Sequence, residues 1–396
     1  MVHSKIIQAD SDPAWVKDMI EWRHAMHRHP EFGFEEDWTS DFIADRLNEF
    51  GIEVIRHIGK TGLVGILQKG SHQRSIGLRA DMDALKIQEQ NEFDHCSRQD
   101  GLMHACGHDG HSSMLLGAAR QLSRQGKFDG TVYFIFQPAE EHGKGALSMI
   151  EDGLFDRFSI DSIYGLHNLP GLAEGHFAIR PGSIMASESN FEIRVRGKGG
   201  HAALPHMGVD ALLIGAQIVV ALQTIISRNL SAINENAVIS VTEFISDGTV
   251  NVIPSNVTIK GDCRCFSQQA LKKIETAMER ISAGICAAAG AEYEFEFVTG
   301  FPSTINAAVE TEHAVRAATE AMGEQRVNPN CDPFTISEDF ANMLHLKPGC
   351  YGLLGNGGEA GGGCALHNPR YDFNDNILLT GARYWVQLVE NQLAET

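Results

Sequence analysis

The stretch Thr131-Val132-Tyr133-Phe134-Ile135-Phe136-Gln137-Pro138-Ala139-Glu140-Glu141 joins an apolar run directly to two adjacent carboxylates. The run over 131–136 is rich in β-branched and aromatic residues, which is typical of a strand buried inside a sheet. Two carboxylates at the end of such a strand are costly to desolvate. Taken alone, the pair fits an acidic helix N-terminus, which the helix dipole stabilises, better than a catalytic site.

Strands and helices alternate on the N-terminal side of this stretch. The run Ser75-Ile76-Gly77-Leu78-Arg79-Ala80 continues into Asp81-Met82-Asp83, and a helix is expected from near Gly110 to Gln125. The same periodicities predict helices over 13–29 and 36–50 and strands over 52–58 and 62–68. This alternation, with polar residues just past the strand ends, predicts an α/β fold with a mostly parallel sheet and a site at its carboxyl edge.

The middle of the chain has a different order of elements. Its periodicity predicts strand 189–196, helix 208–227, strands 236–246 and 256–265, helix 268–289 and strand 291–298. This is the split strand–helix–strand pattern of a small open sandwich. Clusters of His, Cys and carboxylate residues are rare here and frequent on both sides. We therefore expect 187–298 to form an inserted lid domain, and 1–186 with 299–396 to form one discontinuous catalytic domain.

Composition excludes several classes of partner. The chain has 396 residues, enough for two domains, and its formal net charge of −19 repels nucleic acid and anionic membranes. Residues 1–12 lack the basic and apolar parts of a signal peptide, and no uninterrupted apolar run is long enough to span a membrane. The eight cysteines are scattered. We expect a cytoplasmic enzyme without disulfides, with a glycine-rich loop at Gly357–Gly363.

The densest group of potential metal ligands is His104-Ala105-Cys106-Gly107-His108-Asp109-Gly110-His111. The thiolate of Cys106 and the imidazole of His108 suit zinc, cobalt or nickel, and Asp109 is a candidate to orient a ligating imidazole. A polar loop with a buried cysteine explains this segment equally well.

Other candidates are weak one by one and strong together. His167 follows an apolar run, His367 follows a glycine-rich loop, and each alone is typical of a core histidine; Ser337-Glu338-Asp339-Phe340 alone fits a helix cap. Six residues, however, share a position at strand ends or in glycine-rich loops: Cys106, His108, Glu140, Glu141, His167 and His367. Five of them suffice to hold two metal ions, which leaves one glutamate as a base.

The motifs along nearly the whole chain resemble the metal-dependent amidohydrolases that include hippurate hydrolases, N-acyl-amino-acid amidohydrolases and plant auxin-conjugate hydrolases. The motifs are His27-Arg28-His29-Pro30-Glu31, Leu78–Leu85, Met103–His108, Gln137–Glu141, Gly165-Leu166-His167, Gly197–His201, Asn251–Pro254, Ser337–Phe340 and Tyr371–Asp375. The resemblance implies a zinc-peptidase-like α/β catalytic domain, an inserted lid of the dimerisation type, and a homo-oligomer formed through that lid.

Carried over position by position, the resemblance implies a role for each site residue. The ligands of two divalent metal ions would be Cys106, His108, Glu141, His167 and His367. Glu140 would be the general base. His201 of the lid would stabilise the oxyanion, in some relatives from the partner subunit of a dimer, and Asn251 and Arg264 would contact the substrate. Arg264 faces away from Cys263 and Cys265 on its strand, so we expect it to clamp a substrate carboxylate with Asn251 as a further donor.

Three positions depart from the family pattern. His142 stands where many relatives have glycine, and Lys86 replaces a common proline. Asp83 matches an aspartate that orients a metal-binding histidine in wider relatives, but Asp81 stands in the place of that histidine. The roles of His142 and Asp83 therefore stay open at the level of the sequence.

These implications predict hydrolysis of N-acyl or N-aroyl amino acids, such as hippurate, to a carboxylic acid and a free amino acid. The alternative is a dipeptidase or carboxypeptidase on the same scaffold, which would turn over unblocked dipeptides. A non-catalytic protein with structural zinc is more remote, because structural sites are closed and the spare Glu140 indicates an open one. The thiolate favours zinc, cobalt or nickel, whereas relatives are often activated by manganese, so the metal stays open.

Overall fold

The computed structural model describes residues 13–233, 235–358 and 364–395, which separate into two compact units. The described parts of 1–182, 305–332 and 342–396 form the major unit, and those of 183–304 and 333–341 form the inserted unit. The inserted unit thus extends further at both ends than the expected 187–298 and takes in a second short segment. The predictions for residues 1–12, and for most of Gly357–Gly363, lie outside the described residues.

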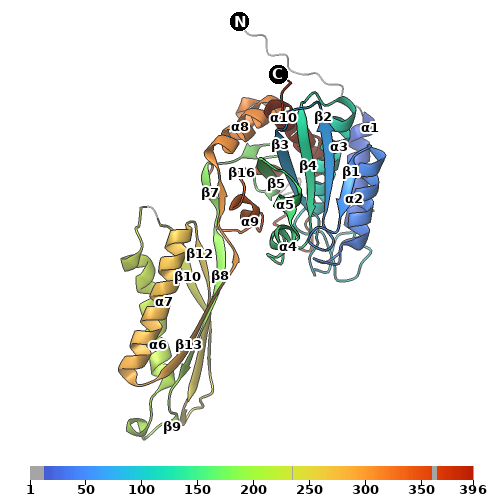
Figure 1. The fold of residues 1–396 in the computed structure, drawn as a ribbon. Coiled ribbons are helices and arrows are strands. Elements are labelled where there is room, and N and C mark those ends of the chain that lie inside the picture. Colours follow the sequence, from blue (N-terminus) through green and yellow to red (C-terminus); the bar gives the residue numbers. More distant parts are fainter. Residues whose placement is uncertain (1–12, 234, 359–363, 396) are drawn as a thin grey trace. The chain divides into compact units, whose positions relative to one another are not determined.

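The major unit is built on an eight-stranded mixed sheet (Figure 1). Its strands in spatial order are β1 (Glu53–Arg56), β2 (Leu63–Lys69), β4 (Gly130–Gln137), β3 (Ser75–Asp81), β5 (Ser162–Pro170), β16 (Gly349–Gly357), β6 (Phe177–Ala178) and β15 (Val327–Asn328). The central strands β4, β3, β5 and β16 run parallel, whereas β2 is antiparallel to both β1 and β4. The prediction of an α/β fold with a mostly parallel central sheet is confirmed.

Helices pack against this sheet and against one another. They are α1 (Pro13–Arg28), α2 (Asp37–Glu49), α3 (His108–Gln125), α4 (Gly145–Glu151), α5 (Leu154–Arg157), α8 (Ala308–Met322) and α10 (Leu378–Gln392), and the short α9 (Ala341–Leu344) spans a boundary between the units. Helix α3 contacts β3, β4 and β5, and α1, α2 and α10 contact α3 in turn. Nearly all of α3 is buried, so its first residue, His108, is held firmly.

The parallel register brings polar residues from separate strands to one edge of the sheet. Asp81, at the end of β3, is paired with Gln137, at the end of β4. On the other side of β3, Arg79 pairs with Gly165 of β5, two residues before His167. Because the strands are parallel, Asp81–Asp83, the turn after Gln137, and His167 meet at the carboxyl edge, as predicted.

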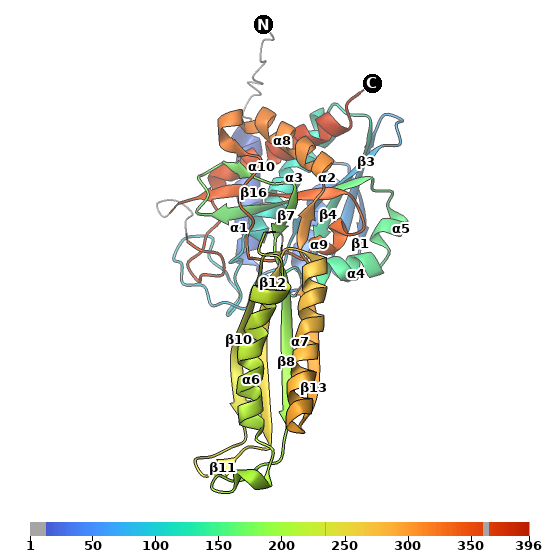
Figure 2. The ribbon, with the colours of Figure 1, turned by 90° about the vertical axis from the view of Figure 1, so that its left-hand side faces the viewer.

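The inserted unit is a four-stranded antiparallel sheet with two helices on one face (Figure 2). In chain order its elements are β8 (Ser187–Arg196), α6 (Ala211–Thr224), β10 (Ala237–Ser246), β12 (Asn256–Cys265), α7 (Gln268–Ala289) and β13 (Glu292–Phe301), with the spatial order β10-β12-β8-β13. Alternate residues of β12, including Cys263 and Cys265, point into the core under α6 and α7. The predicted split strand–helix–strand order is confirmed.

One helix of the inserted unit has an unusually apolar surface. Ala211–Asn229, which joins α6 to a π-helical turn (Ile225–Asn229), is long and apolar enough by composition alone to cross a membrane, yet only about a third of it is buried. The buried side chains, such as Ile218 and Leu222, belong to the core over the sheet. A helix that packs on a sheet with one side and stays apolar on the other indicates a surface for another protein chain as readily as a membrane.

Candidate metal centre

Separate segments of the major unit meet at the carboxyl edge of its sheet. Cys106 precedes α3 and His108 begins it, Glu141 lies in the turn after β4, His167 lies in β5, and His367 follows the Gly-rich segment. The entry into α3 requires a glycine at Gly107, which has a φ of 98°. A Cβ there would lie 2.3 Å from the Asn168 side-chain oxygen and 2.7 Å from the Tyr371 hydroxyl.

The five predicted ligands form two groups that share one residue. Potential ligand atoms of Cys106, His108 and His167 all lie within 4.8 Å of one another, and so do those of Cys106, Glu141 and His367. The Cys106 Sγ is 3.4 Å from Nε2 of His167, and Nε2 of His367 is 3.3 Å from a carboxylate oxygen of Glu141. This arrangement offers two neighbouring cation positions with a thiolate between them.

Two buried atoms of this cluster lack the hydrogen bonds that buried polar atoms normally make. His108 Nε2 and Glu141 Oε1 make no hydrogen bond of good geometry among the described residues; the two atoms are 3.9 Å apart, and Glu141 Oε1 also forms the ion pair with His367. Buried polar atoms without partners are rare because they lose their hydration without compensation. A metal ion coordinated by both atoms would remove that cost.

The other nitrogen of each buried ligand histidine is engaged by the protein. His108 Nδ1 lies 2.9 Å from the backbone oxygen and 3.1 Å from the carboxylate of Asp83, and His167 Nδ1 lies 2.6 Å from the backbone oxygen of Asn168. Such contacts fix the imidazole tautomer and leave Nε2 to face a metal. Asp83 therefore orients a candidate ligand histidine, which settles the role that the sequence left open.

Asp81 and Asp109 both bind side chains outside the five candidate ligands. Asp81 is held by the Arg79 guanidinium (2.7 Å) and by Nδ1 of His111 (2.6 Å), so its charge is already balanced. Asp109 does not contact a ligand imidazole. Its carboxylate meets His27 Nδ1 at 2.8 Å and Arg23 at 3.5 Å. The expectation that Asp109 orients a ligand is wrong, because its position on α3 turns it towards α1.

The protonation states of the cluster fit a site completed by cations. Burial, and then Glu141 and Glu140, raise the pKa of the Cys106 thiol well above its usual range. Burial lowers the pKa of His167, which keeps it neutral. Burial alone would also lower the pKa of His108, but Asp81 and Asp83 raise it to about 10. A divalent cation displaces protons from thiol and imidazole ligands, so the donor set fits two metal ions.

Glu140 lies beside both groups without being needed by either. Its carboxylate is within 4.8 Å of the ligand atoms of His108 and Glu141, and the residue is only 6% exposed. The preceding residue, Ala139, adopts a left-handed φ of 48°, which is uncommon for a residue with a Cβ. A carboxylate in this position is suited to exchange a proton with water or substrate at the cluster.

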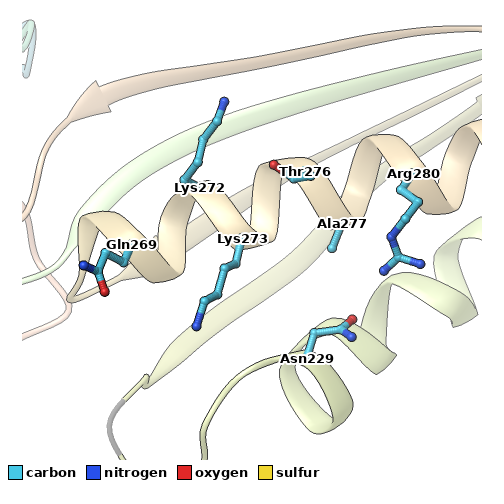
Figure 3. Close-up of a pocket in the computed structure, with 7 residues that line it drawn as sticks. All are labelled: Asn229, Gln269, Lys272, Lys273, Thr276, Ala277 and Arg280. Carbon is cyan, nitrogen blue, oxygen red and sulfur yellow. The ribbon is translucent and has the colours of Figure 1, made fainter.

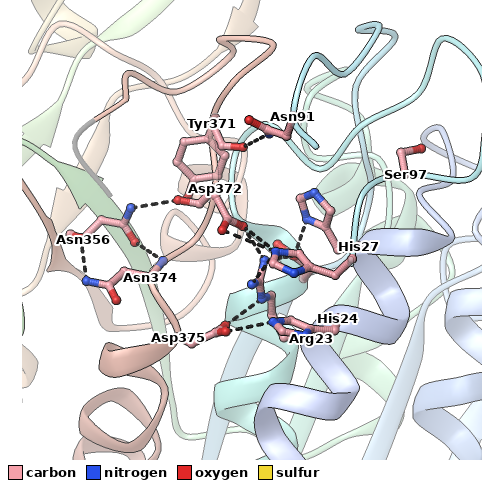
Figure 4. Close-up of polar contacts among 12 residues, drawn as sticks. Arg23, His24, His27, Asn91, Ser97, Asn356, Tyr371, Asp372, Asn374 and Asp375 are labelled. Atoms are coloured by element: carbon pink, nitrogen blue, oxygen red, sulfur yellow. Dashed lines mark hydrogen bonds and ion pairs between the residues drawn. The ribbon is translucent and has the colours of Figure 1, made fainter. Parts of the chain in front are cut away.

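A network of buried charges behind the cluster was missed by the sequence reasoning (Figure 4). Arg23 of α1 is fully buried and binds Asp372 at 2.6 Å and Asp375 at 2.8 Å. His27, one turn later, bridges Asp109 and Glu89. The network joins α1 to the Tyr371–Asp375 motif and to the loop before Cys106. Arg23 and His27 continue, at i, i+4 spacing, the face of α1 that carries the apolar Trp15 and Met19, and that was the available signal.

In the inserted unit, His201 and Asn251 lie side by side at one end of the sheet. The two-residue strands β9 (Gly200–His201) and β11 (Val252–Ile253) are paired, and the backbone nitrogen of Ala202 donates to the Asn251 carbonyl at 3.0 Å. Both His201 and Asn251 are exposed to solvent. The structure thus brings together two of the predicted lid residues, on a surface open to another molecule.

Arg264 lies near the opposite end of the same sheet. It lies eight positions along β12 from Asn256, which corresponds to about 26 Å at roughly 3.3 Å per residue. Arg264 faces away from the core, as predicted, and binds Glu188 at 2.8 Å and Asp262 at 3.0 Å. Within one chain the structure does not bring Arg264 and Asn251 together, so the expected shared clamp cannot form from a single copy.

The groove of the inserted unit beside the N-terminal half of α7 is basic (Figure 3). Its lining includes Lys272, Lys273 and Arg280. Lys272 binds Glu275 at 2.8 Å and Lys273 binds Glu235 at 2.5 Å. Because carboxylates of the protein already neutralise both lysines, these two side chains are poor anchors for a substrate carboxylate.

Comparison with known families and proteins shows what the whole chain is similar to. Residues 77–391 match the family described as Peptidase family M20/M25/M40. The hippurate hydrolase of Campylobacter jejuni is 40% identical over 366 residues, which cover 92% of this chain and 94% of that protein. An N-acyl-L-amino acid amidohydrolase of Geobacillus stearothermophilus is 42% identical over 291 residues, 73% of this chain and 78% of that one.

Solved structures show the same similarity. A dinuclear metal binding peptidase of the M20 family from Bacillus subtilis superposes with a TM-score of 0.84 and 32% identity, covering 96% of this chain and 99% of that one. An aminohydrolase from methicillin-resistant Staphylococcus aureus superposes with a TM-score of 0.90 and 34% identity, covering 96% and 97%.

Proposed function

The chain belongs to peptidase family M20/M25/M40 and is a metal-dependent amidohydrolase, and we propose that its substrates are N-acyl or N-aroyl amino acids such as hippurate. The observation that supports this most is the sharing of Cys106 by two groups of ligand atoms, with Glu140 beside them. A single structural metal site would need neither the second group nor a spare carboxylate.

The residues of the cluster divide between two divalent cations. Cys106, His108 and His167 would hold one, and Cys106, Glu141 and His367 would hold the other. When bound, the cations supply Lewis acids that polarise the scissile carbonyl and lower the pKa of water. Zinc, cobalt, nickel and manganese are all candidates, and the thiolate favours the softer ions.

Glu140 performs the proton transfers. In the proposed reaction its carboxylate accepts a proton from the attacking water and delivers it to the leaving amine, so that the products are a carboxylic acid and a free amino acid. The nearly complete burial of Glu140 keeps bulk water from competing for that proton. Asp83 supports the same step indirectly, because it fixes the imidazole of His108.

The inserted unit would supply the remaining contacts through a second copy of the chain. Edge strand β13 carries Glu292, Glu294 and Glu296, and charges of this kind oppose pairing with another strand. The other edge, β10, instead exposes apolar residues, and its neighbour α6 exposes more. These residues are Val238, Phe244 and Ile245 of β10, and Leu212, Leu213 and Val220 of α6. We propose that two copies associate through β10 and α6.

Such a homodimer would give His201 and Asn251 a partner. They are adjacent and exposed in one chain, as expected of residues that act on a site completed by association. His201 would stabilise the developing oxyanion and Asn251 would contact the substrate, each in the site of the other copy. Arg264 would bind the substrate carboxylate by exchanging one of its present partners, Glu188, Asp262 or Ser337.

We also propose that the enzyme works inside the cell. All eight cysteines lie within the described residues and none forms a disulfide. Several are buried in the cores of the two units, which suits a reducing compartment.

The test is hydrolysis of N-benzoylglycine by purified protein, with benzoate and glycine quantified after chelation and after addition of each candidate metal. We expect turnover that depends on added metal, and much poorer turnover when the substrate carboxylate is blocked as an amide. Unblocked dipeptides are the control, because preferential cleavage of dipeptides would assign the chain to the dipeptidase alternative.

A further inference from the structure

The turn that carries Glu140 is held by one buried carboxylate on each side. The backbone nitrogen of Ala139 donates to the carboxylate of Glu36 at 2.9 Å, and that of Glu141 donates to Asp83 at 3.1 Å. The two amides that flank Glu140 are therefore both fixed by side chains from distant parts of the chain. Asp83 also orients His108, whereas Glu36 has no part in the reaction described above.

Glu36 occupies a helix N-cap position but does not cap the helix. Its side chain makes no capping hydrogen bond to α2. Glu31 does so in its place, because its carboxylate accepts the backbone nitrogens of Trp38 (3.0 Å) and Thr39 (2.8 Å). The carboxylate of Glu36 instead turns inward and binds Thr61 Oγ1 at 2.6 Å and the Ala139 nitrogen.

A carboxylate in this place is unfavourable for stability alone. Glu36 is 0% exposed, and no cation pairs with it among the described residues. Burial, and then the charge of Asp83, raise its pKa to about 7. Removing a carboxylate from water without a counter-ion costs several kcal/mol in general. The presence of Glu36 here is therefore explained better by the backbone that it holds in place than by a gain in stability.

The segment around Glu36 touches the same turn a second time. A Cβ on Gly33 would lie 2.7 Å from the ring of His142 and 2.9 Å from the Cα of Ala139, so the two backbones are in close contact. The rings of Phe32 and His142 are 4.3 Å apart. Lys86 lies 3.8 Å from the centre of the Phe32 ring. Two of the departures from the family pattern, His142 and Lys86, thus meet at one aromatic side chain.

We propose that segment Phe32–Glu36 holds the turn that carries Glu140 in place, and that Glu36 is the residue that positions this turn. By accepting the Ala139 amide, Glu36 fixes the left-handed conformation at Ala139 and with it the direction of the Glu140 side chain. Phe32 and Gly33 hold the far end of the turn through His142. This inference rests on the proposed role of Glu140 as the base.

The experiment compares three substitutions of Glu36 in the metal-loaded protein, with the N-acyl amino acid that the wild type cleaves fastest. Glu36→Gln keeps an acceptor at the same reach, Glu36→Asp keeps the charge but shortens the reach, and Glu36→Leu removes the acceptor. We expect Glu36→Gln to keep most of kcat. Glu36→Asp and Glu36→Leu should lose kcat by roughly 10- to 100-fold, as a base displaced by about 1 Å would, with KM and metal content unchanged.

The matched control is Glu31→Gln, in the same loop, which weakens the cap of α2 without touching the turn. It should lower thermal stability while kcat of the folded enzyme stays at the wild-type value. If Glu36→Leu fails to fold, the proposal is still tested by the other two variants, because kcat of Glu36→Gln should exceed that of Glu36→Asp. Wild-type kcat in Glu36→Asp, equal losses in the Gln and Asp variants, or loss of metal in step with activity would each overturn the proposal. Failure of the wild type to cleave any N-acyl amino acid would instead refute the proposed function.

Discussion

The two units of this protein present their candidate functional residues in opposite ways. In the major unit, residues from distant segments meet within 4.8 Å, and most of them are buried. In the inserted unit, His201 and Asn251 are exposed at one end of a sheet and Arg264 lies near the other. Some ion pairs of the major unit, such as Arg23 with Asp109, are fully buried, whereas pairs of the inserted unit such as Arg194 with Glu294 are exposed.

This difference shows where each part of the site is completed. Burying histidines, carboxylates and a thiol together is unfavourable unless they are paired or bound to metal, so the major unit forms its part of the site as it folds. Exposed residues of the inserted unit carry no such cost, and His201 and Asn251 form hydrogen bonds to residues close to them in one chain, such as Ala203 and Ala202. They become functional only against another surface, which we propose is a second copy.

The largest effect is expected from removal of Cys106, the ligand that both groups share in the major unit. Cys106→Ala should lose both metal ions and all activity, because Cys106 belongs to both groups of ligand atoms. His367→Ala should lose mainly one ion, because it belongs to one group. Elemental analysis of protein purified and dialysed under identical conditions measures both. Full occupancy in both variants would contradict the ligand assignment.

Removal of the base should separate chemistry from metal binding. Glu140→Gln keeps the shape of the side chain but is a poor proton acceptor, so we expect kcat to fall by roughly 10²–10⁴-fold at unchanged metal content. Steady-state kinetics combined with elemental analysis provide the measurement. A variant that stays active would show that Glu140 is not the base.

The inserted unit should affect catalysis without affecting the metals. His201→Ala should lower kcat by roughly 10²-fold or more if it stabilises the oxyanion, with metal content unchanged. If His201 acts across a dimer, mixing His201→Ala with Glu140→Gln protein should restore part of the activity, because one site of each mixed dimer is intact. No recovery after verified subunit exchange would place His201 in the site of its own chain, or outside the site altogether.

The smallest expected effect is on the pH dependence of stability. Burial alone would lower the pKa of His27, but Asp109 and Glu89 raise it to about 9 in the folded protein. A raised pKa adds stability that is fully present below the unfolded value of about 6.5 and is lost as pH rises towards 9. The contribution is roughly 3 kcal/mol at most.

Chemical unfolding of the metal-loaded protein at pH 6 and pH 9 measures this effect. Wild type should lose more stability over that range than His27→Gln. The matched control is Glu294→Gln in the inserted unit, which removes exposed ion pairs with Arg194 and Arg196 and should change stability far less. An identical pH dependence in wild type and His27→Gln would show that the buried network does not hold a protonated histidine.

Much of this protein follows from local sequence patterns. The strand over 131–136, the alternation that makes the sheet, and the order of elements between 189 and 298 are encoded by periodicity and were predicted within a few residues. The candidate ligands could be found because thiolate, imidazole and carboxylate groups at the ends of apolar strands are chemically conspicuous. Their roles, however, came from resemblance to a family rather than from spacing.

Only the tertiary structure decided which side chains meet. Asp83, not Asp109, orients His108, because that choice depends on how α3 docks on β3 and not on neighbours in sequence. The distance between Asn251 and Arg264 depends on strand register, which the sequence specifies only through pairing with other strands. The inward turn of Glu36 depends on Thr61 and Ala139, 25 and 103 residues away. Such contacts arise from long-range packing, for which a local pattern carries no signal.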